Sequence, residues 1–379
     1  MPKATSRSEY KTAGPTLYLA LELGRAQWKL GFSTRLGERP RLRTIAGGNL
    51  LELSSEIALA KKFFGLRRDC RVLSCYEAGR DGFWIHRALV EAGVESLVVD
   101  SSSIEVNRRQ RKAKTDGLDA RRLLDLLIRF DLGSRHVWSV VRVPTPEQED
   151  ARHLHRELRT LKTDQTRLRN RIRGLLFGQG IRVGAISGRL DLDRLRCWDG
   201  KPLLSGLRRR LVAELEHLTS IHRRILDLEA ARRAALATSS ERCLAQTAKL
   251  MRLRGLGHNA SWLFAHELFG WRELRNRRQV GGLAGLTSTP HASGDSTRER
   301  GISKAGIRSV RHMAIEIAWR WTHFQPRSAL TRWYEKRFGN AGPRLRRIGI
   351  VALARKLLVA LWRYLEFDEL PQGAKLKPV

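Results

Sequence analysis

Apolar and polar residues in the first third of the chain are arranged in a way that predicts five strands. Residues 17–24 form a nearly continuous apolar run that contains one acid, Glu22, which is typical of a buried strand. Residues 27–33 alternate between apolar and polar side chains, as a half-buried strand does. Three more segments have strand character: residues 41–46, 71–76 and 96–99.

The same region contains segments with helical spacing. Leu53, Ile57, Ala60 and Phe64 recur on one stripe of residues 50–64, residues 83–92 form a second helix, and a third opens at Asp116. The predicted order is three strands, helix, strand, helix, strand, helix. This order favours a mixed sheet covered by helices, in an α/β domain over residues 16–145.

The next region, residues 146–245, is predicted to be all-α. A long helix begins near Glu147, and after a break at 178–188 a second runs over about 202–237. Both have apolar residues at alternating steps of four and three, the heptad pattern of a coiled coil. Because sustained heptads need a partner helix, we expect oligomerisation, although pairing within one chain fits equally well. The predicted seam positions are Leu154, Leu158, Leu161, Gln165, Leu168, Ile172 and Leu175, then Leu211, Leu215, Leu218, His222 and Ile225.

Residues 246–367 are predicted to form a mostly helical domain. Gly255 and Gly257 lie between two helical stretches, as in half of a helix-hairpin-helix, where backbone N–H groups approach a phosphate closely. A tight helix–helix turn is the simpler alternative. Residues 281–306 are rich in Gly, Ser and Thr, a composition that by itself predicts a flexible loop. Residues 1–15 and 368–379 are predicted to be polar tails.

Charge narrows the function. The chain has 72 Lys and Arg against 38 Asp and Glu, a net charge of +34, which favours nucleic acid as the partner. The predicted contacts are Arg108, Arg109, Arg111, Lys112, Lys114, Gly255, Gly257, Arg298, Arg300, Lys304 and Arg308. No uninterrupted apolar segment is long enough to span a membrane, and the first residues lack the apolar core of a signal peptide. Four scattered cysteines indicate reduced thiols, so we expect a cytoplasmic protein.

In so basic a chain, a few carboxylates are candidates for metal binding. Asp116 and Asp119 are three residues apart at the opening of a predicted helix, so they share a helix face. Mg²⁺ prefers carboxylate oxygens, and its charge relieves the repulsion between them. Helix capping is the alternative role for this pair. Glu22 lies in the first strand and Glu77 follows the fourth, where solvent exposure and turn capping are the alternatives.

The order of elements resembles the ribonuclease H-like fold, in which acids lie in the first strand, after the fourth and on a later helix. Three motifs strengthen a resemblance to the DEDD transposases of the insertion sequence 110/1111 family. They are residues 76–84 (YEAGRDGFW), 100–107 (DSSSIEVN) and 114–120 (KTDGLDA). Those enzymes pair a RuvC-like amino-terminal domain with a carboxy-terminal transposase domain. The family has Asp in the first strand, where this chain has Glu22.

The resemblance implies that Glu22, Glu77, Asp116 and Asp119 bind Mg²⁺. It also implies a catalytic serine in a Ser-Gly loop, which matches Ser293 here, with Ser296 as the second choice. Its other implications are a guide RNA that pairs with donor and target DNA, and a homodimer or homotetramer. The expected function is therefore that of an insertion-sequence transposase.

Two other functions fit the same residues. One is a RuvC-like nuclease that uses a metal-bound water in place of Ser293. The other is a nucleic-acid-binding protein without catalytic activity, such as a decayed copy of a transposase gene would encode.

Overall fold

The computed structural model describes residues 14–79, 82–104, 116–188, 190–238, 241–293 and 296–378. The chain divides into two compact units, Met1–Val143 and Pro144–Val379, which we call the sheet unit and the helical unit. Each is described by itself. The regions predicted separately as 146–245 and 246–367 both lie in the helical unit.

The sheet unit contains the five strands that the sequence predicts, at β1 (Leu17–Leu23), β2 (Gln27–Ser33), β3 (Arg41–Ala46), β4 (Val72–Glu77) and β5 (Glu95–Val99). They form one mixed sheet in the order β3-β2-β1-β4-β5. The first three strands form an antiparallel meander, and β4 and β5 run parallel to β1. The predicted α/β class with a mixed sheet is confirmed.

Helices cover both faces of this sheet. Side chains of α1 (Leu50–Phe63) and α2 (Trp84–Glu91) pack with Leu19, Leu21 and Tyr76 on one face. α3 (Asp116–Asp131) packs with Tyr18, Ala20 and Cys75 on the other face. This alternation along β1 follows from the period of two in a strand, which sends successive side chains to opposite faces.

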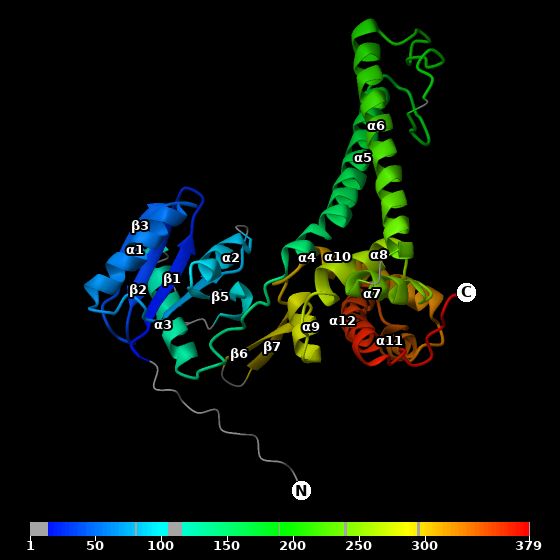
Figure 1. The fold of residues 1–379 in the computed structure, drawn as a ribbon. Helices are drawn as coiled ribbons and strands as arrows, with labels where there is room; N and C mark the ends of the chain where they lie inside the picture. The colour runs from blue at the N-terminus through cyan, green and yellow to red at the C-terminus, as the bar shows by residue number, and fades with distance from the viewer. Residues whose placement is uncertain are drawn as a thin grey trace. The chain divides into compact units, whose positions relative to one another are not determined.

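The helical unit begins with a short helix, α4 (Pro146–Asp150), followed by α5 (His153–Phe177) and α6 (Ser205–Thr238). We call α5 and α6 the arm; they lie side by side and antiparallel (Figure 1), with Lys162 bonded to Glu229 and Arg171 to Glu214. The heptad seams therefore have a partner helix within one chain. Ile221 is buried in the seam and His222 is exposed, so the prediction of His222 as a seam residue is wrong.

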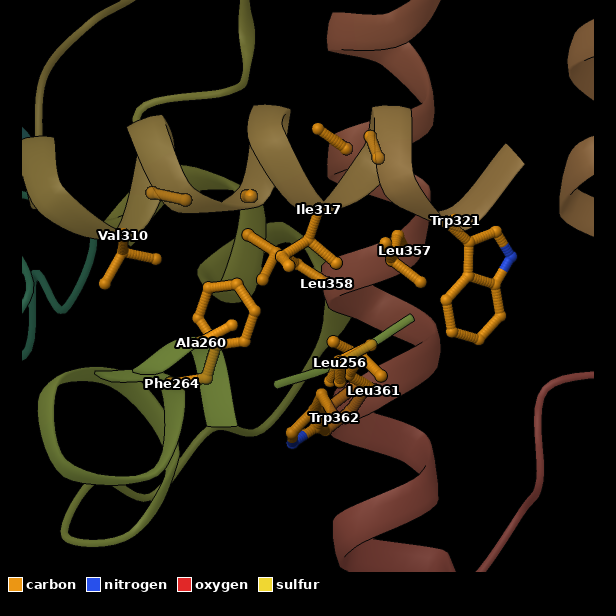
Figure 2. Packing of buried hydrophobic residues seen from close by; sticks show 14 of the residues in the cluster. Leu256, Ala260, Phe264, Val310, Ile317, Trp321, Leu357, Leu358, Leu361 and Trp362 are labelled. Carbon is orange, nitrogen blue, oxygen red and sulfur yellow. The ribbon is translucent and has the colours of Figure 1, made fainter. Parts of the chain in front are cut away.

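The remaining helices form a second core in the helical unit. They are α7 (Arg242–Met251), α8 (His258–Leu263), a π-helical turn (Phe264–Phe269), α9 (Arg277–Leu283), α10 (Arg308–Phe324), α11 (Ala329–Phe338) and α12 (Pro343–Phe367). Figure 2 shows Val310, Ile317 and Trp321 along α10, and Leu357 and Leu361 of α12 belong to the same core. Leu256, from the turn between α7 and α8, points into the same core.

Two segments predicted to lack regular structure are ordered. Residues 281–306 contain a hairpin of β6 (Ser288–Ser293) and β7 (Ser296–Ile302), so the flexible loop predicted from composition is wrong. The predicted tail after residue 367 packs on the helical core, where Leu376 forms a β-bridge with Leu253. Among the described residues, no helix is both long and apolar enough to cross a membrane.

Candidate functional site

Glu22 and Glu77 lie next to each other at the carboxyl ends of two neighbouring strands. β1 and β4 are parallel neighbours whose register aligns Leu21 with Tyr76, and the two acids are the next residues along each strand. Glu22 is half-buried and Glu77 is exposed. The carboxyl ends of two parallel strands thus bring together acids that are 55 positions apart in the sequence.

Both acids belong to the face of the sheet that α3 covers. Alternation along β1 places Glu22 on the same face as Ala20, and alternation along β4 places Glu77 on the same face as Cys75. The pKa of the Cys75 thiol is raised, first by burial and then by the negative charge of Glu77. The charge of Glu77 is therefore felt on this side of the sheet.

α3, the helix that contains both predicted aspartates, packs on the same face. Ala120 is fully buried, and its carbonyl oxygen lies over Gly31 of β2. Asp119, one residue earlier, is half-buried, and Asp116 is the first residue of the helix. The side chain of Asp116 is outside the described part of the structure. Among the side chains that are described, no three His, Cys, Asp or Glu residues form a metal-binding group. Metal binding by the four acids stays a prediction.

The predicted basic segment before α3 lies outside the described residues. It contains Arg108, Arg109, Arg111, Lys112 and Lys114. Arg298 and Arg300 are on β7, and only their backbone is described. Arg308 is the first residue of α10. Lys304 follows β7 and has a left-handed backbone (φ 55°), and its N–H donates to the carbonyl of Gly285.

Ser293 is the last residue of β6 and pairs directly with Ser296, the first residue of β7. The two serines that the sequence offers as nucleophiles therefore lie opposite each other at one end of the hairpin. At the other end of the hairpin, two glycines allow backbone segments to pack closely. A Cβ on Gly285 would lie 2.1 Å from the carbonyl oxygen of Ala305, and one on Gly306 would lie 2.3 Å from that of Leu283. Only glycine allows such close contact at these positions.

The turn Gly255-Leu256-Gly257 borders a cavity of about 630 Å³ in the helical unit. We call it the cationic cavity, because basic side chains from separate segments line it: Arg254, Arg320, Arg327, Lys375 and Lys377. Sequence reasoning identified the two glycines but missed Arg320, Arg327, Lys375 and Lys377. The alternation of Lys375, Leu376 and Lys377 is a short strand signal that could have indicated a packed segment.

A partly buried charge cluster, with Glu267 buried and Arg156 exposed, joins the base of the arm to the helical core. Arg156 of α5 donates from Nε and Nη2 to the two carboxylate oxygens of Glu267, at 2.8 and 2.9 Å. Burial raises the pKa of Glu267, but the hydrogen bonds and charge of Arg156 outweigh it, so the pKa lies below its usual range. This bidentate pair fixes α5 to the π-helical turn.

Two histidines and an arginine complete this cluster. Burial lowers the pKa of both His155 and His266 to about 4. The ring of His266 stacks on Trp262 with 4.8 Å between centroids, and the Arg232 guanidinium lies 4.4 Å from the centroid of the same indole. Burial lowers the pKa of Arg232 to about 10. The cluster therefore depends on the two imidazoles being neutral.

Comparison with known proteins gives matches to transposases. The model of the family described as "Transposase IS116/IS110/IS902 family" matches residues 247–333. "Putative transposase y4rJ" of Sinorhizobium fredii (strain NBRC 101917 / NGR234) is 38% identical over 377 residues, which are 95% of this chain and 94% of that protein. "Probable family 20 transposase" of Pseudomonas aeruginosa PAO1 is 27% identical over 62% of this chain and 69% of its own length.

Proposed function

This chain belongs to the IS116/IS110/IS902 family of transposases, and we propose that it cuts and rejoins DNA by magnesium-assisted phosphoryl transfer with a serine nucleophile. The family accounts for DNA as the substrate. The metal, the nucleophile and the guide RNA are our proposal.

The position of Glu22 and Glu77 carries the proposal. Both lie at the carboxyl ends of adjacent parallel strands, on the face covered by the helix that contains Asp119. The sheet order β3-β2-β1-β4-β5, with only β2 antiparallel to the rest, supports a ribonuclease H-like domain with its acids in the expected elements. A capping or solvent-facing role for each acid would not require this shared location.

The donor set fits Mg²⁺. Carboxylates are the protein ligands that this ion prefers, and the four proposed ligands are Glu22, Glu77, Asp116 and Asp119. When bound, the ion supplies charge stabilisation for a phosphoryl group under attack. Lys29 lies directly opposite Glu22 on β2, so a cation already balances part of the negative charge at this edge.

Ser293 is the proposed nucleophile. Its hydroxyl oxygen forms a bond to the scissile phosphorus, the hydroxyl proton passes to a nearby base or water, and the bond from phosphorus to the deoxyribose oxygen breaks. The leaving deoxyribose oxygen takes a proton from water or from that base, so the released strand end carries a hydroxyl. The hydroxyl of another strand then attacks the phosphoserine, which restores Ser293 and joins the new strand pair.

The large positive charge supports a guide RNA as a second nucleic-acid partner. A net charge of +34 is several times the roughly 6–10 phosphate contacts of a typical DNA-binding protein, which leaves positive charge for a second nucleic acid. Protein contacts would then recognise nucleic-acid shape while base pairing selects the donor and target sequences. We further propose a homodimer or homotetramer, in which the acids and the serine come from different subunits.

The covalent intermediate gives the decisive test of the nucleophile. The full-length protein is incubated with Mg²⁺ and labelled DNA that contains the ends of its element, and adducts are trapped by denaturation. Ser293→Ala should abolish both cleavage and the protein–DNA adduct, whereas the matched control Ser296→Ala should retain both. Cleavage that persists in Ser293→Ala would instead identify a nuclease that uses water. Reversal of the two serine results would assign the nucleophile to Ser296.

The acids and the RNA have their own tests. Asp116→Asn and Asp119→Asn should each abolish cleavage and keep nucleic-acid binding; unchanged cleavage would contradict the metal proposal. Sequencing of RNA that co-purifies with the protein should recover one defined RNA encoded beside its gene. A random RNA population would contradict the guide.

A further inference from the structure

The cationic cavity gathers positive charge from four separate segments of the helical unit. Arg254 precedes the glycine turn, Arg320 belongs to α10, Arg327 follows that helix, and Lys375 and Lys377 come from the segment after α12. All five side chains belong to exposed residues. Residues up to 123 positions apart in the sequence are therefore brought to one opening.

No carboxylate balances this charge. The cavity is lined by no Asp or Glu, and within the described residues none of the five cations forms an ion pair. The pKa of Lys377 is lowered, first by burial and then by the positive charge of Arg320. Like charges held together without an acid favour an anionic ligand, because its binding removes their repulsion.

The backbone around the cavity is held rigidly. Gln325 is 1% exposed; its side-chain N–H₂ donates to the carbonyls of Arg254 and Lys375, at 2.9 and 2.8 Å. Its side-chain oxygen accepts from the backbone N–H of Lys375 at 2.8 Å. One buried amide thus ties the glycine turn to the segment after α12, and the Leu253–Leu376 bridge extends the same contact.

The glycine turn is also held in place by contacts with the helical core. Gly255 has a left-handed backbone (φ 92°) that allows the reversal, and Leu256 is buried in the core beside Leu361 and Trp362, as Figure 2 shows. Lys377 donates to the carbonyl of Leu256 at 2.8 Å. A site that is already ordered loses little entropy when it binds a ligand.

We propose that the cationic cavity binds the phosphodiester backbone of a nucleic acid, and that residues 373–377 are part of this site. Five cations around about 630 Å³ exceed what one inorganic phosphate requires, and they suit successive phosphates of one strand. Phe324 is 44% exposed at the rim, where an aromatic ring can contact a sugar or base. The contact does not depend on sequence, since its groups are cations and backbone.

This inference rests on the proposed function in one respect, that the ligand is a nucleic acid. The shared chemistry is the phosphodiester chain, and its source is either DNA or the guide RNA. The test measures binding of the full-length protein to a labelled DNA duplex and to an RNA duplex of the same sequence, by fluorescence anisotropy at salt concentrations from ~50 to ~200 mM.

The informative variant is Lys375→Ala with Lys377→Ala. The matched control, Lys336→Ala with Arg337→Ala, removes the same charge from the exposed end of α11. We expect the cavity variant to bind roughly tenfold more weakly and its salt slope on DNA to fall by about 2, one for each lost phosphate contact. The control should show less than half of either change. Lys375→Arg with Lys377→Arg should restore binding, which separates charge from folding.

The outcomes assign the ligand or overturn the site. Weaker binding to the DNA duplex alone identifies DNA as the ligand, weaker binding to the RNA duplex alone identifies RNA, and weaker binding to both identifies a backbone contact that either can make. Equal affinities and slopes for the cavity and control variants, with both proteins folded by circular dichroism, would overturn the inference. That failure would leave the Ser293 adduct intact. If the proposed function is wrong, the adduct is absent whatever the cavity variant does.

Discussion

Charged side chains are arranged differently in the Arg71 network of the sheet unit and in the cationic cavity of the helical unit. In the sheet unit, Arg71 donates to Glu95 and Asp131, and Asp131 also accepts from Tyr18 at 2.8 Å, so the cation and its neighbours form one satisfied network. In the helical unit, the cationic cavity holds five cations without a carboxylate among the described residues. The difference indicates where a ligand must supply the missing charge. Arg71 is paired with acids and supports the fold, whereas the five cations, unpaired within the described part of the chain, form the proposed ligand site.

The largest expected effect comes from variants of the sheet unit that should lose DNA cleavage and keep DNA binding. Glu22→Gln and Glu77→Gln in the sheet unit should reduce DNA cleavage by roughly 10³-fold or more, because several kcal/mol of transition-state stabilisation are removed. The same variants should bind DNA at least as tightly as the wild type, since a negative charge is lost. Cleavage assays beside anisotropy measure the two effects. A variant that keeps its cleavage rate would exclude that glutamate from the site.

Acid should affect the helical unit first. The pKa values of His155 and His266 are about 4 in the folded protein and about 6.5 when unfolded. The unfolded chain therefore takes up protons first, so stability is complete above about pH 6.5 and is lost as the pH falls towards 4. Each histidine contributes about 3 kcal/mol to that loss. Hydrogen exchange should show α5 and the π-helical turn opening before the sheet.

A matched pair of variants checks the origin of this acid sensitivity. His155→Leu removes one buried imidazole and should reduce the loss of stability in acid by about half. His222→Leu changes an exposed ring and should leave that loss unchanged. Burial also lowers the pKa of His86 in the sheet unit. The two units should therefore differ in how much stability they lose in acid. Simultaneous opening of both units near pH 5 would contradict it.

The glycine turn offers a smaller effect. Gly255→Ala places a Cβ on a left-handed residue, 3.3 Å from the Cβ of Phe324, and should destabilise the helical unit by about 1–3 kcal/mol. Gly257→Ala meets no atom within 4 Å and has an ordinary φ of −104°, so it should change stability little. Urea unfolding measures both. Equal stabilities would show that the turn is not held as the structure indicates.

The smallest expected effect tests the paired charges of the sheet unit. Tyr18→Phe removes the hydrogen bond to Asp131 and should cost about 1 kcal/mol. Burial, followed by the hydrogen bond to Asp131, raises the pKa of Tyr18 to about 12. The folded state therefore keeps its proton longer, and wild-type stability should fall as the pH rises from 10 towards 12. Thermal unfolding should show a weaker alkaline decline in Tyr18→Phe.

The sequence predicted the sheet unit well because its signals are local. The nearly continuous apolar run in 17–24 marks a buried strand, and the alternation in 27–33 marks a second strand. Three strands before the first helix then leave few possible topologies. The sequence placed Glu22 and Glu77 on the first and fourth strands, and the structure shows that these strands are parallel neighbours. Their face of the sheet required the structure, since it depends on where α3 packs.

The helical unit was harder to predict because its decisive contacts are distant in the sequence. Heptads in α5 and α6 require a partner without identifying it, and a shorter step between Leu218 and Ile221 moved the seam away from His222. The β6–β7 hairpin was not predicted, because its segment is rich in Gly, Ser and Thr and its strands have weak apolar alternation. The cationic cavity depends on Gln325 joining segments 50 and 71 residues away, which no local pattern reveals.

Because the two helices of the arm pair with each other, the arm can become longer or shorter without disturbing the rest of the helical unit. Each layer of the seam contacts the layer opposite, so seven residues added to α5 and seven to α6 would preserve every existing contact. Such a paired insertion lengthens the arm by about 10 Å without altering the Arg156–Glu267 attachment at its base. Related proteins can therefore differ in reach while keeping the same core, and a designer could vary the arm in the same steps.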